Sequence, residues 1–110
     1  MPDREIVIPD AMKLIPERMG YVPAVRVGDV LYCSGQIGRN SQLEVILDPE
    51  QQFIAAWENL RLVLEAGGCT FADVVDMTTY HVDIDQHLAL HRDVKDRVSP
   101  EAIVPGQPSA

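Results

Sequence analysis

Residues 21–38 read YVPAVRVGDVLYCSGQIG, and this stretch decides the fold of the chain. Apolar and β-branched residues flank the dipeptide Gly28-Asp29 on both sides. Such a two-residue connection predicts a β-hairpin, because glycine supplies the positive φ that the turn needs. The second strand ends in the small polar loop Ser34-Gly35-Gln36. Since a strand end is a rigid platform for polar groups, we expect this loop to belong to the functional site.

The residues that precede and follow the hairpin are less regular. Residues 4–8 form a short strand candidate that Pro9 closes. Residues 13–20 contain a proline and a glycine and are expected to be an irregular approach to the hairpin. Residues 40–47 alternate weakly in polarity and predict a loop or a short extension.

A long amphipathic helix is expected after residue 48. Asp48 is a natural N-cap, and Pro49 suits the first helical position, where a missing N–H costs nothing. Gly67 and Gly68 end the pattern, as the C-termini of helices favour. One helical stripe consists of Phe53, Trp57, Leu60 and Leu64. We therefore expect Trp57 to pack in a core and not to bind a ligand.

The last part of the chain predicts a strand and a second helix. Residues 74–83 are rich in β-branched and aromatic residues, and residues 86–98 have helical periodicity. Asp85 is expected to cap this helix, Ser99-Pro100 to stop it, and residues 104–110 to be an open tail. The order is β-β(hairpin)-α-β-α, which predicts an α+β two-layer α/β sandwich in a single domain, residues 1–110.

The composition of the chain disfavours several classes of function. The chain has 110 residues, nine basic against 17 acidic, and a formal charge of −8, with no basic run, which disfavours a nucleic-acid partner. No apolar run is long enough to cross a membrane, and the N-terminus does not resemble a signal peptide. Cys33 and Cys69 lack metal-binding spacing, so reduced thiols and a cytoplasmic location are expected. Cys33, in a strand, is expected to be a small buried hydrophobe.

The residue patterns also disfavour several kinds of active site. His87 and His91 share a helix face, but no glutamate stands between them as in HExxH, so no metal site is expected. The text around Ser34 is not GxSxG, which argues against a nucleophile triad. What remains is the cluster of Tyr21, Ser34 and the Gly35 backbone, because a hairpin brings its outer ends together and the two hydroxyls could meet there.

Several segments together resemble the RidA/YjgF family, also called endoribonuclease L-PSP. They are Tyr21, the Gly-Asp turn, SGQIG at residues 34–38, ENLRLVLEAGG at residues 58–68 and ADVVDMTTYHVDI at residues 72–84. The resemblance implies a chorismate-mutase-like sandwich and a homotrimer with ligand clefts between subunits. It also implies hydrolysis of reactive imines and enamines to 2-oxo acids and ammonia, without a cofactor.

The resemblance also assigns roles to residues. It implies that Tyr21, Ser34 and His91 are catalytic, His91 taking the place of an asparagine that is common on the second helix. It further implies that the ligand is bound by Gly35, Gln36 and Ile37.

One departure from the family concerns the arginine that binds the substrate carboxylate in deaminating members. Its place falls on Ala110 or is missing, and the last two strands of the family have no counterpart. We expect either a C-terminally incomplete sequence, the preferred alternative, or a member without the usual chemistry. Arg39 is the nearest cationic substitute in the sequence.

Three functions therefore compete. The first is a trimer that binds small carbonyl or carboxylate metabolites and deaminates imines. The second is a non-catalytic trimer that binds a metabolite. The third, an endoribonuclease, fits poorly with the net charge of −8.

Overall fold

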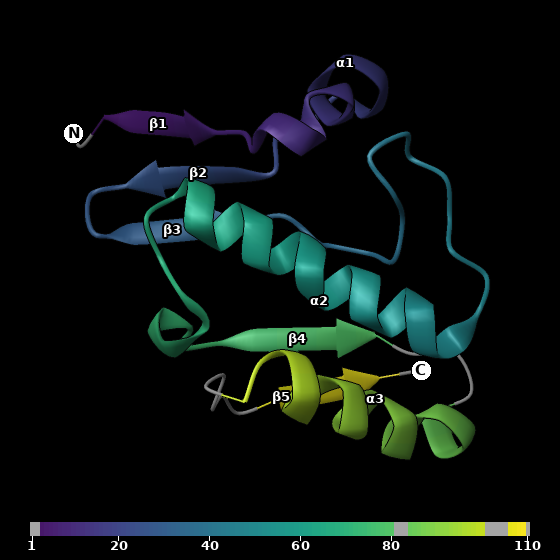
Figure 1. Ribbon diagram of the computed structural model, residues 1–110. Coiled ribbons are helices and arrows are strands. Elements are labelled where there is room, and N and C mark those ends of the chain that lie inside the picture. Colours follow the sequence, from purple (N-terminus) through teal and green to yellow (C-terminus); the bar gives the residue numbers. More distant parts are fainter. Residues whose placement is uncertain (1–2, 81–83, 101–105, 110) are drawn as a thin grey trace.

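The computed structural model describes residues 3–80, 84–100 and 106–109. It contains a three-stranded antiparallel sheet, a two-stranded parallel sheet and helices that pack on them (Figure 1). The α+β class is as predicted. In chain order the elements are β1 (Arg4–Val7), η1 (Asp10–Met12), α1 (Leu14–Met19), β2 (Ala24–Val27), β3 (Val30–Cys33), α2 (Pro49–Ala66), η2 (Phe71–Asp73), β4 (Met77–Tyr80), α3 (Ile84–Val98) and β5 (Gly106–Ser109).

The hairpin forms as the sequence predicts. Strands β2 and β3 pair antiparallel, with Val27 opposite Val30 at the turn. Gly28 has a φ of 60°, a conformation that other L residues rarely adopt. Strand β1 pairs with the outer edge of β2, so the sheet order is β1-β2-β3.

Helix α2 begins and ends as expected. The Asp48 carboxylate accepts a hydrogen bond of 3.0 Å from the backbone N–H of Gln51 and so caps the helix. Pro49 is the first helical residue, and the helix ends before Gly67. Trp57 is buried in the core, as predicted.

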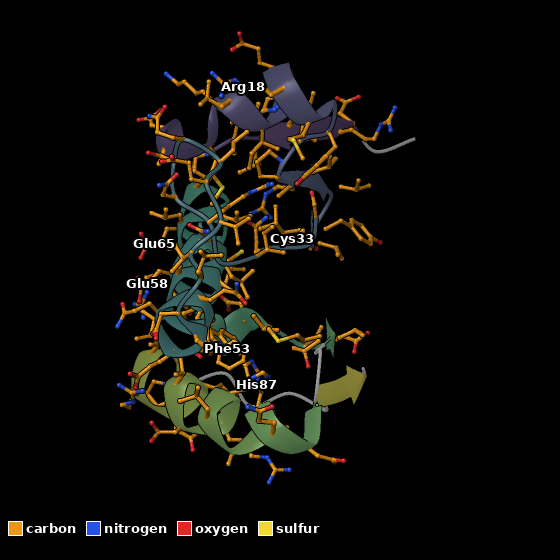
Figure 2. All side chains as sticks on the ribbon, turned by 90° about the vertical axis from the view of Figure 1, so that its right-hand side faces the viewer. Arg18, Cys33, Phe53, Glu58, Glu65 and His87 are labelled. Atoms are coloured by element: carbon orange, nitrogen blue, oxygen red, sulfur yellow. The ribbon has the colours of Figure 1, made fainter. Side chains whose placement is uncertain are left out.

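Helix α2 contributes to both hydrophobic clusters of the described chain. Its buried Val63 packs in a cluster with residues from β1, η1, α1 and β2. On another face of the helix, Trp57 and Leu64 pack with Phe71 and with Val94 of α3. Figure 2, turned by 90°, shows α2 on one side of the strands of both sheets. The helix therefore joins two sheets that share no strand pairing.

Residues 13–20 are not irregular, contrary to the prediction, because they contain α1. Pro16 does not break this helix, because it lies in the first turn, where backbone N–H groups have no intrahelical partner. Gly20 follows with a φ of 77° and closes the helix in the left-handed conformation. Ile15 is buried and fixes α1 against the three-stranded sheet.

The expectation of an open C-terminal tail is also wrong for residues 106–109. They form β5, which pairs in parallel with β4. The sequence GQPS has neither alternation nor β-branched residues, so only this long-range pairing makes it a strand. Pro108 fits because β5 is an edge strand within the described residues, where one missing N–H is tolerated.

The boundaries of the last strand and helix differ from those expected. The predicted strand 74–83 is shorter at its start, since β4 begins at Met77 after the turn η2, and residues 81–83 lie outside the described residues. Helix α3 ends at Val98 as predicted. Asp85 lies inside the first turn of α3 and is therefore not its cap.

The loop that follows β3 is held closely against α2. The backbone N–H of Ile46 donates to the Gly38 carbonyl at 2.9 Å, and the side-chain amide of Gln52 donates to the Ile46 carbonyl at 2.8 Å. Gly38 is buried, and a Cβ atom there would collide with the backbone carbonyl group of Gln52. Gly38 thus allows the loop to approach the helix backbone.

We expect Gly38→Ala to lower the free energy of unfolding by about 1–3 kcal/mol, because the added methyl group must displace the backbone of α2. The control is Gly35→Ala, since nothing lies within 4 Å of a Cβ atom at Gly35. This variant should change stability by less than about 0.5 kcal/mol. Urea unfolding followed by circular dichroism measures both, and equal midpoints for the two variants would contradict the close approach.

Candidate functional site

The hydroxyl group of Ser34 is fixed at the end of β3. Its O–H donates its single proton to the backbone carbonyl oxygens of Val22 and of Pro23, which share it, the latter at 3.0 Å. The backbone N–H of Ser34 also donates to Pro23, at 2.8 Å. The hydroxyl proton is thereby directed into the backbone, and the lone pairs of the oxygen remain as acceptors. Ser34 is arranged to accept a hydrogen bond and not to be activated as a nucleophile.

The next residues expose polar backbone groups. Gly35 is exposed, and its N–H donates to no acceptor among the described residues. The side chain of Ile37 is 51% exposed, so it leaves an apolar surface beside this donor. The side-chain amide of Gln36 donates weakly to the Ser34 carbonyl, at 3.4 Å. The predicted ligand-binding residues therefore form one continuous exposed loop.

Tyr21 lies at the same edge of the hairpin, next to the residue whose carbonyl Ser34 binds. Its phenol oxygen accepts a hydrogen bond of 2.8 Å from the guanidinium group of Arg39. The predicted cluster is therefore brought together, but the phenol pairs with Arg39 and not with the Ser34 hydroxyl. Because the phenol oxygen is the acceptor, its O–H remains available to donate.

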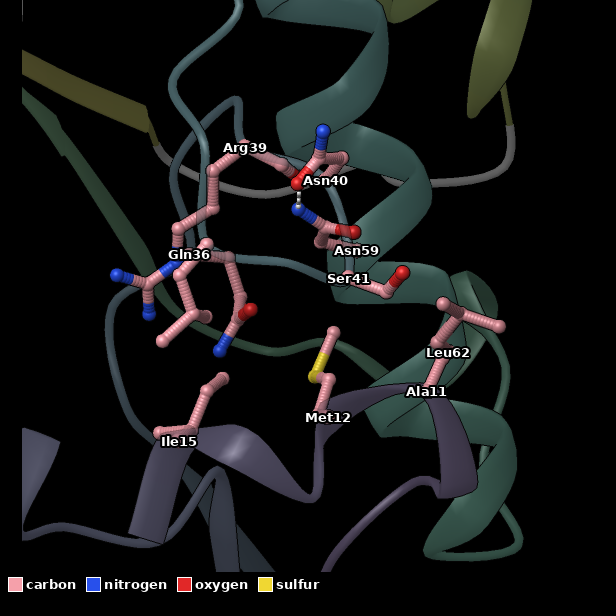
Figure 3. A pocket seen from close by; sticks show the side chains of 10 residues that line it. Ala11, Met12, Ile15, Gln36, Arg39, Asn40, Ser41, Asn59 and Leu62 are labelled. Atoms are coloured by element: carbon pink, nitrogen blue, oxygen red, sulfur yellow. Dashed lines mark hydrogen bonds between the residues drawn. The ribbon is translucent and has the colours of Figure 1, made fainter. Parts of the chain in front are cut away.

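A hollow of about 150 Å³ opens beside this loop (Figure 3). Its apolar wall comes from η1, α1, the loop and α2, and its polar wall comes largely from the loop. The lining residues are Ala11, Met12, Ile15, Gln36, Arg39, Asn40, Ser41, Leu43, Asn59 and Leu62. A second hollow of about 310 Å³ shares Gln36 and is lined by Ile37, Gly38, Val45, Gln52 and Ala56.

Asn59 of α2 holds the loop in place. Its side-chain amide donates to the carbonyl oxygens of Ile37 and Arg39, each at 2.9 Å. Figure 3 shows Asn59 beside Arg39 and Asn40. This role of Asn59 was not predicted from the sequence, although Asn59 lies within the family-like segment at residues 58–68. An amide side chain beside the apolar stripe of a helix was the one available indication, since such a group usually finds a backbone partner.

His91 is a half-buried residue of α3 whose ring contacts side chains of α2. Its Nε2 accepts a hydrogen bond of 3.2 Å from the indole N–H of Trp57, against which the imidazole is stacked. The ring of Phe53 meets the imidazole edge-on, with ring centres 5.3 Å apart. Because an indole N–H can only donate, Nε2 carries no proton in this arrangement. The catalytic role expected for His91 stays a prediction.

His87 lies outside the loop that carries the candidate site. His87 lies one turn before His91 and meets the ring of Phe53 edge-on, with ring centres 6.2 Å apart (Figure 2). His81 lies outside the described residues. Among the residues that are described, no three His, Cys, Asp or Glu side chains are grouped to hold a metal ion. No helix in the described ranges is long and apolar enough to cross a membrane.

Cys33 is exposed, which corrects the expectation of a buried side chain. It ends β3, an edge strand of its sheet, so no neighbouring strand covers it within the described part of the chain. The thiol itself is partly enclosed, and this local burial raises the pKa of Cys33, with a smaller contribution from Cys69. A raised pKa lowers the fraction of thiolate and argues against a nucleophilic role.

These features define an α+β two-layer domain whose hairpin end carries a polar loop. The chain belongs to the RidA/YjgF family, because residues 13–108 match the family described as Endoribonuclease L-PSP. The RutC family protein YjgH of Escherichia coli is 37% identical over 83 residues, which cover 76% of this chain and 63% of YjgH. The chain thus spans less than two thirds of the length of this curated relative.

Other known proteins are also similar to this chain in sequence or in structure. A 2-iminobutanoate/2-iminopropanoate deaminase of Dermatophagoides farinae is 37% identical over 70 residues, 61% of this chain and 55% of that protein. The solved structure of YjgH has a TM-score of 0.86 at 30% identity and covers 97% of this chain and 84% of that chain. RidA from an Antarctic Psychrobacter has a TM-score of 0.74 at 27% identity, over 80% and 72% of the two chains. The YjgF-type fold is thereby confirmed.

We expect alkylation of Cys33 by iodoacetamide to accelerate at higher pH than alkylation of a free cysteine, because the thiolate reacts and the pKa lies above its ordinary value of 9.0. Since folding raises this pKa, its contribution to stability is fully present below the unfolded pKa and is lost as pH rises through the folded pKa. Peptide mapping by mass spectrometry separates Cys33 from Cys69. A rate that accelerates at lower pH than that of glutathione would contradict the raised pKa.

Proposed function

We propose that this protein is a RidA-type enzyme that binds small carbonyl or carboxylate metabolites and hydrolyses reactive imines and enamines to 2-oxo acids and ammonia. Family membership and the printed activity of the D. farinae relative support this class of reaction. The observation that carries the proposal is the arrangement of Tyr21, Ser34 and Gly35 at one edge of the hairpin. The loop after β3 supplies a donor and an acceptor, and Tyr21, which precedes β2, supplies a second donor.

Each group has a role in this proposal. The Gly35 N–H and the Tyr21 O–H are donors that polarise the substrate, and the fixed Ser34 oxygen accepts a hydrogen bond from the attacking water. Water adds to the C=N carbon, the nitrogen takes a proton, and the C–N bond breaks to release ammonia and leave a 2-oxo acid. This sequence consumes one water and needs no cofactor. His91 is the proton carrier of this proposal, and its Nε2 accepts a hydrogen bond from the Trp57 indole.

A homotrimer belongs to the same proposal. The sheet face opposite α2 is apolar and uncovered within the described chain: Ile6, Val30 and Tyr32 are 61%, 50% and 62% exposed. Register places Ile6, Val25 and Tyr32 side by side on this face. A patch of this kind favours burial against another subunit, with the ligand clefts between subunits. A cytoplasmic location is part of the proposal and agrees with two free cysteines.

Two other functions remain as outcomes of the test. A non-catalytic trimer that binds a metabolite is the alternative, because Ser34 lacks the proton-accepting partner that a nucleophile requires. Ribonuclease activity, which the printed family name suggests, is disfavoured by the charge of −8.

The activity test is ammonia release from freshly generated 2-aminoacrylate. We expect the double variant Tyr21→Phe, Ser34→Ala to lose about 100-fold in kcat/KM, because it removes one donor and one acceptor from the reaction centre. Tyr32→Phe is the control, since it removes an exposed phenol oxygen that the proposal does not place at the reaction centre. A double variant as fast as the wild type would remove both residues from the mechanism, and binding without turnover in the wild type would favour the non-catalytic alternative.

The assembly test is the mass in solution. We expect the wild type to have three times the chain mass of 12.2 kDa, and Tyr32→Glu to reduce it, because a charge on the apolar sheet face resists burial. Val75→Glu is the matched control, since Val75 is 84% exposed and lies outside both sheets. Light scattering after size-exclusion chromatography measures all three, and a trimeric Tyr32→Glu variant would contradict this interface.

A further inference from the structure

We propose that Trp57 is a positioning residue that sets the protonation state of His91. Its indole N–H holds the imidazole as the neutral tautomer with the proton on Nδ1, and protonation of the ring in mildly acidic solution breaks this contact between α2 and α3. The catalytic relevance of His91 rests on the proposed function, but the state of its ring can be measured in the absence of any substrate.

Two ring nitrogens face each other across the helix pair. The indole Nε1 of Trp57 donates to Nε2 of His91 at 3.2 Å. An indole nitrogen carries a hydrogen and can only donate, so Nε2 must keep its lone pair as the acceptor. The single ring proton of a neutral imidazole is then placed on Nδ1. The tautomer of His91 is therefore decided by Trp57.

The indole is held in one orientation by the core around it. Trp57 is buried and packs in a cluster with Phe71 and with Val94 of α3. The rings of Trp57 and Phe71 meet at an angle of 63°, with their centres 5.8 Å apart. Phe53, one turn before Trp57 on α2, meets the imidazole edge-on with ring centres 5.3 Å apart. The donor and its acceptor are thus both positioned by buried aromatic contacts.

Protonation of the imidazole changes Nε2 from an acceptor into a donor. The imidazolium carries an N–H on both ring nitrogens, so two donors would face each other across the 3.2 Å between His91 and Trp57. A stacked imidazolium also gains a cation–π attraction to an indole, but these ring centres are 5.7 Å apart, close to the limit of about 6 Å for that interaction. The loss of the acceptor is therefore the larger effect, and acid separates the two rings.

The charged groups around this contact are paired with other groups. Within the described residues, the charged and titratable side chains on the neighbouring turns of the elements that pack here are Glu50 and Arg61 of α2, Asp73 of η2, and His87 and Lys95 of α3. The four charged groups have partners at 4.0 Å or less, which are Arg97 for Glu50, Glu58 for Arg61, Asp96 for Lys95 and the backbone N–H of Thr70 for Asp73. His87 is the one other member of this set that ordinarily titrates between about pH 5 and pH 8.

The stability of the fold therefore depends on pH in a defined direction. The folded state favours the neutral ring of His91, whereas the unfolded chain takes up the imidazole proton near the ordinary value of about 6.5. The contribution of the contact to stability is present above that value and is lost as pH falls. The Nδ1–H of His91 is a proton donor of fixed direction only while this contact holds.

The first experiment follows Trp57, the only tryptophan of the chain, by fluorescence as the full chain is acidified. We expect a transition with a midpoint below about pH 6.5, because a hydrogen bond to the neutral imidazole disfavours its protonation. Long-range nitrogen–proton NMR spectra at neutral pH should show Nε2 of His91 unprotonated and Nδ1 protonated. A protonated Nε2 at neutral pH, or a fluorescence that does not change on acidification, would overturn the proposal.

The variants assign the transition to residues. Trp57→Phe keeps an aromatic ring but removes the donor, so NMR should show His91 titrating about half to one pH unit higher than in the wild type. His91→Gln keeps an acceptor that does not titrate and should abolish the fluorescence transition. His87→Gln, one turn away, is the matched control and should leave the transition in place.

Three outcomes with these variants would contradict the proposal. One is a lower midpoint in Trp57→Phe, which a dominant cation–π attraction would produce. The others are a transition that persists in His91→Gln and one that vanishes in His87→Gln. Thermal unfolding at neutral pH shows which variants fold, and the His91→Gln result decides the question if Trp57→Phe does not.

The outcome is separable from that of the proposed function. If the wild type releases no ammonia but Nε2 of His91 is unprotonated and the ring titrates as expected, the role of Trp57 stands and the deaminase proposal fails. If ammonia release is normal while Nε2 is protonated at neutral pH, the role of Trp57 is wrong and the deaminase proposal stands. If both hold, the acid limb of kcat/KM should move in Trp57→Phe by the same amount as the NMR midpoint of His91.

Discussion

The structure depends on the burial of helix α2 along two of its faces. Val63 packs in the cluster under β1 and β2, whereas Trp57 and Leu64 pack with Phe71 and α3. Among the residues that the structure describes, no strand pairing joins the two sheets, so α2 is the main element that gives them a common interior. Its burial removes apolar surface of both sheets from water, which is the dominant favourable term for a chain of this size.

The same helix positions the candidate site. Gln52 and Asn59 bind carbonyl groups of the loop that follows β3, and Gly38 lets this loop approach the helix backbone. The opposite end of the loop is fixed by Ser34 against the carbonyl groups of Val22 and Pro23. The exposed donors and acceptors between these points are therefore held by buried contacts, as a binding site on a small domain requires. The stability of the fold and the geometry of the candidate site therefore depend on the same hydrogen bonds.

Much of the fold could be predicted because its signals are local. The Gly28-Asp29 turn, the Asp48 cap and the apolar stripe of α2 each depend on residues within a few positions of one another, and each is confirmed. Two predictions were wrong, for different reasons. A helix forms at α1 because Pro16 lies in its first turn, where the missing N–H costs nothing. In β5, the local sequence carries no strand pattern, and pairing with β4 alone makes the strand.

For the site, the sequence by itself determined which groups would gather, since a two-residue turn brings Tyr21 and Ser34 to one edge of a hairpin. It did not determine how they bond. Only the tertiary structure pairs the Tyr21 phenol with Arg39, turns the Ser34 hydroxyl into the backbone and inserts His91 beneath Trp57. The physical reason is that these contacts join residues that are far apart in the sequence. Their geometry is fixed by packing on α2, which no short sequence pattern encodes.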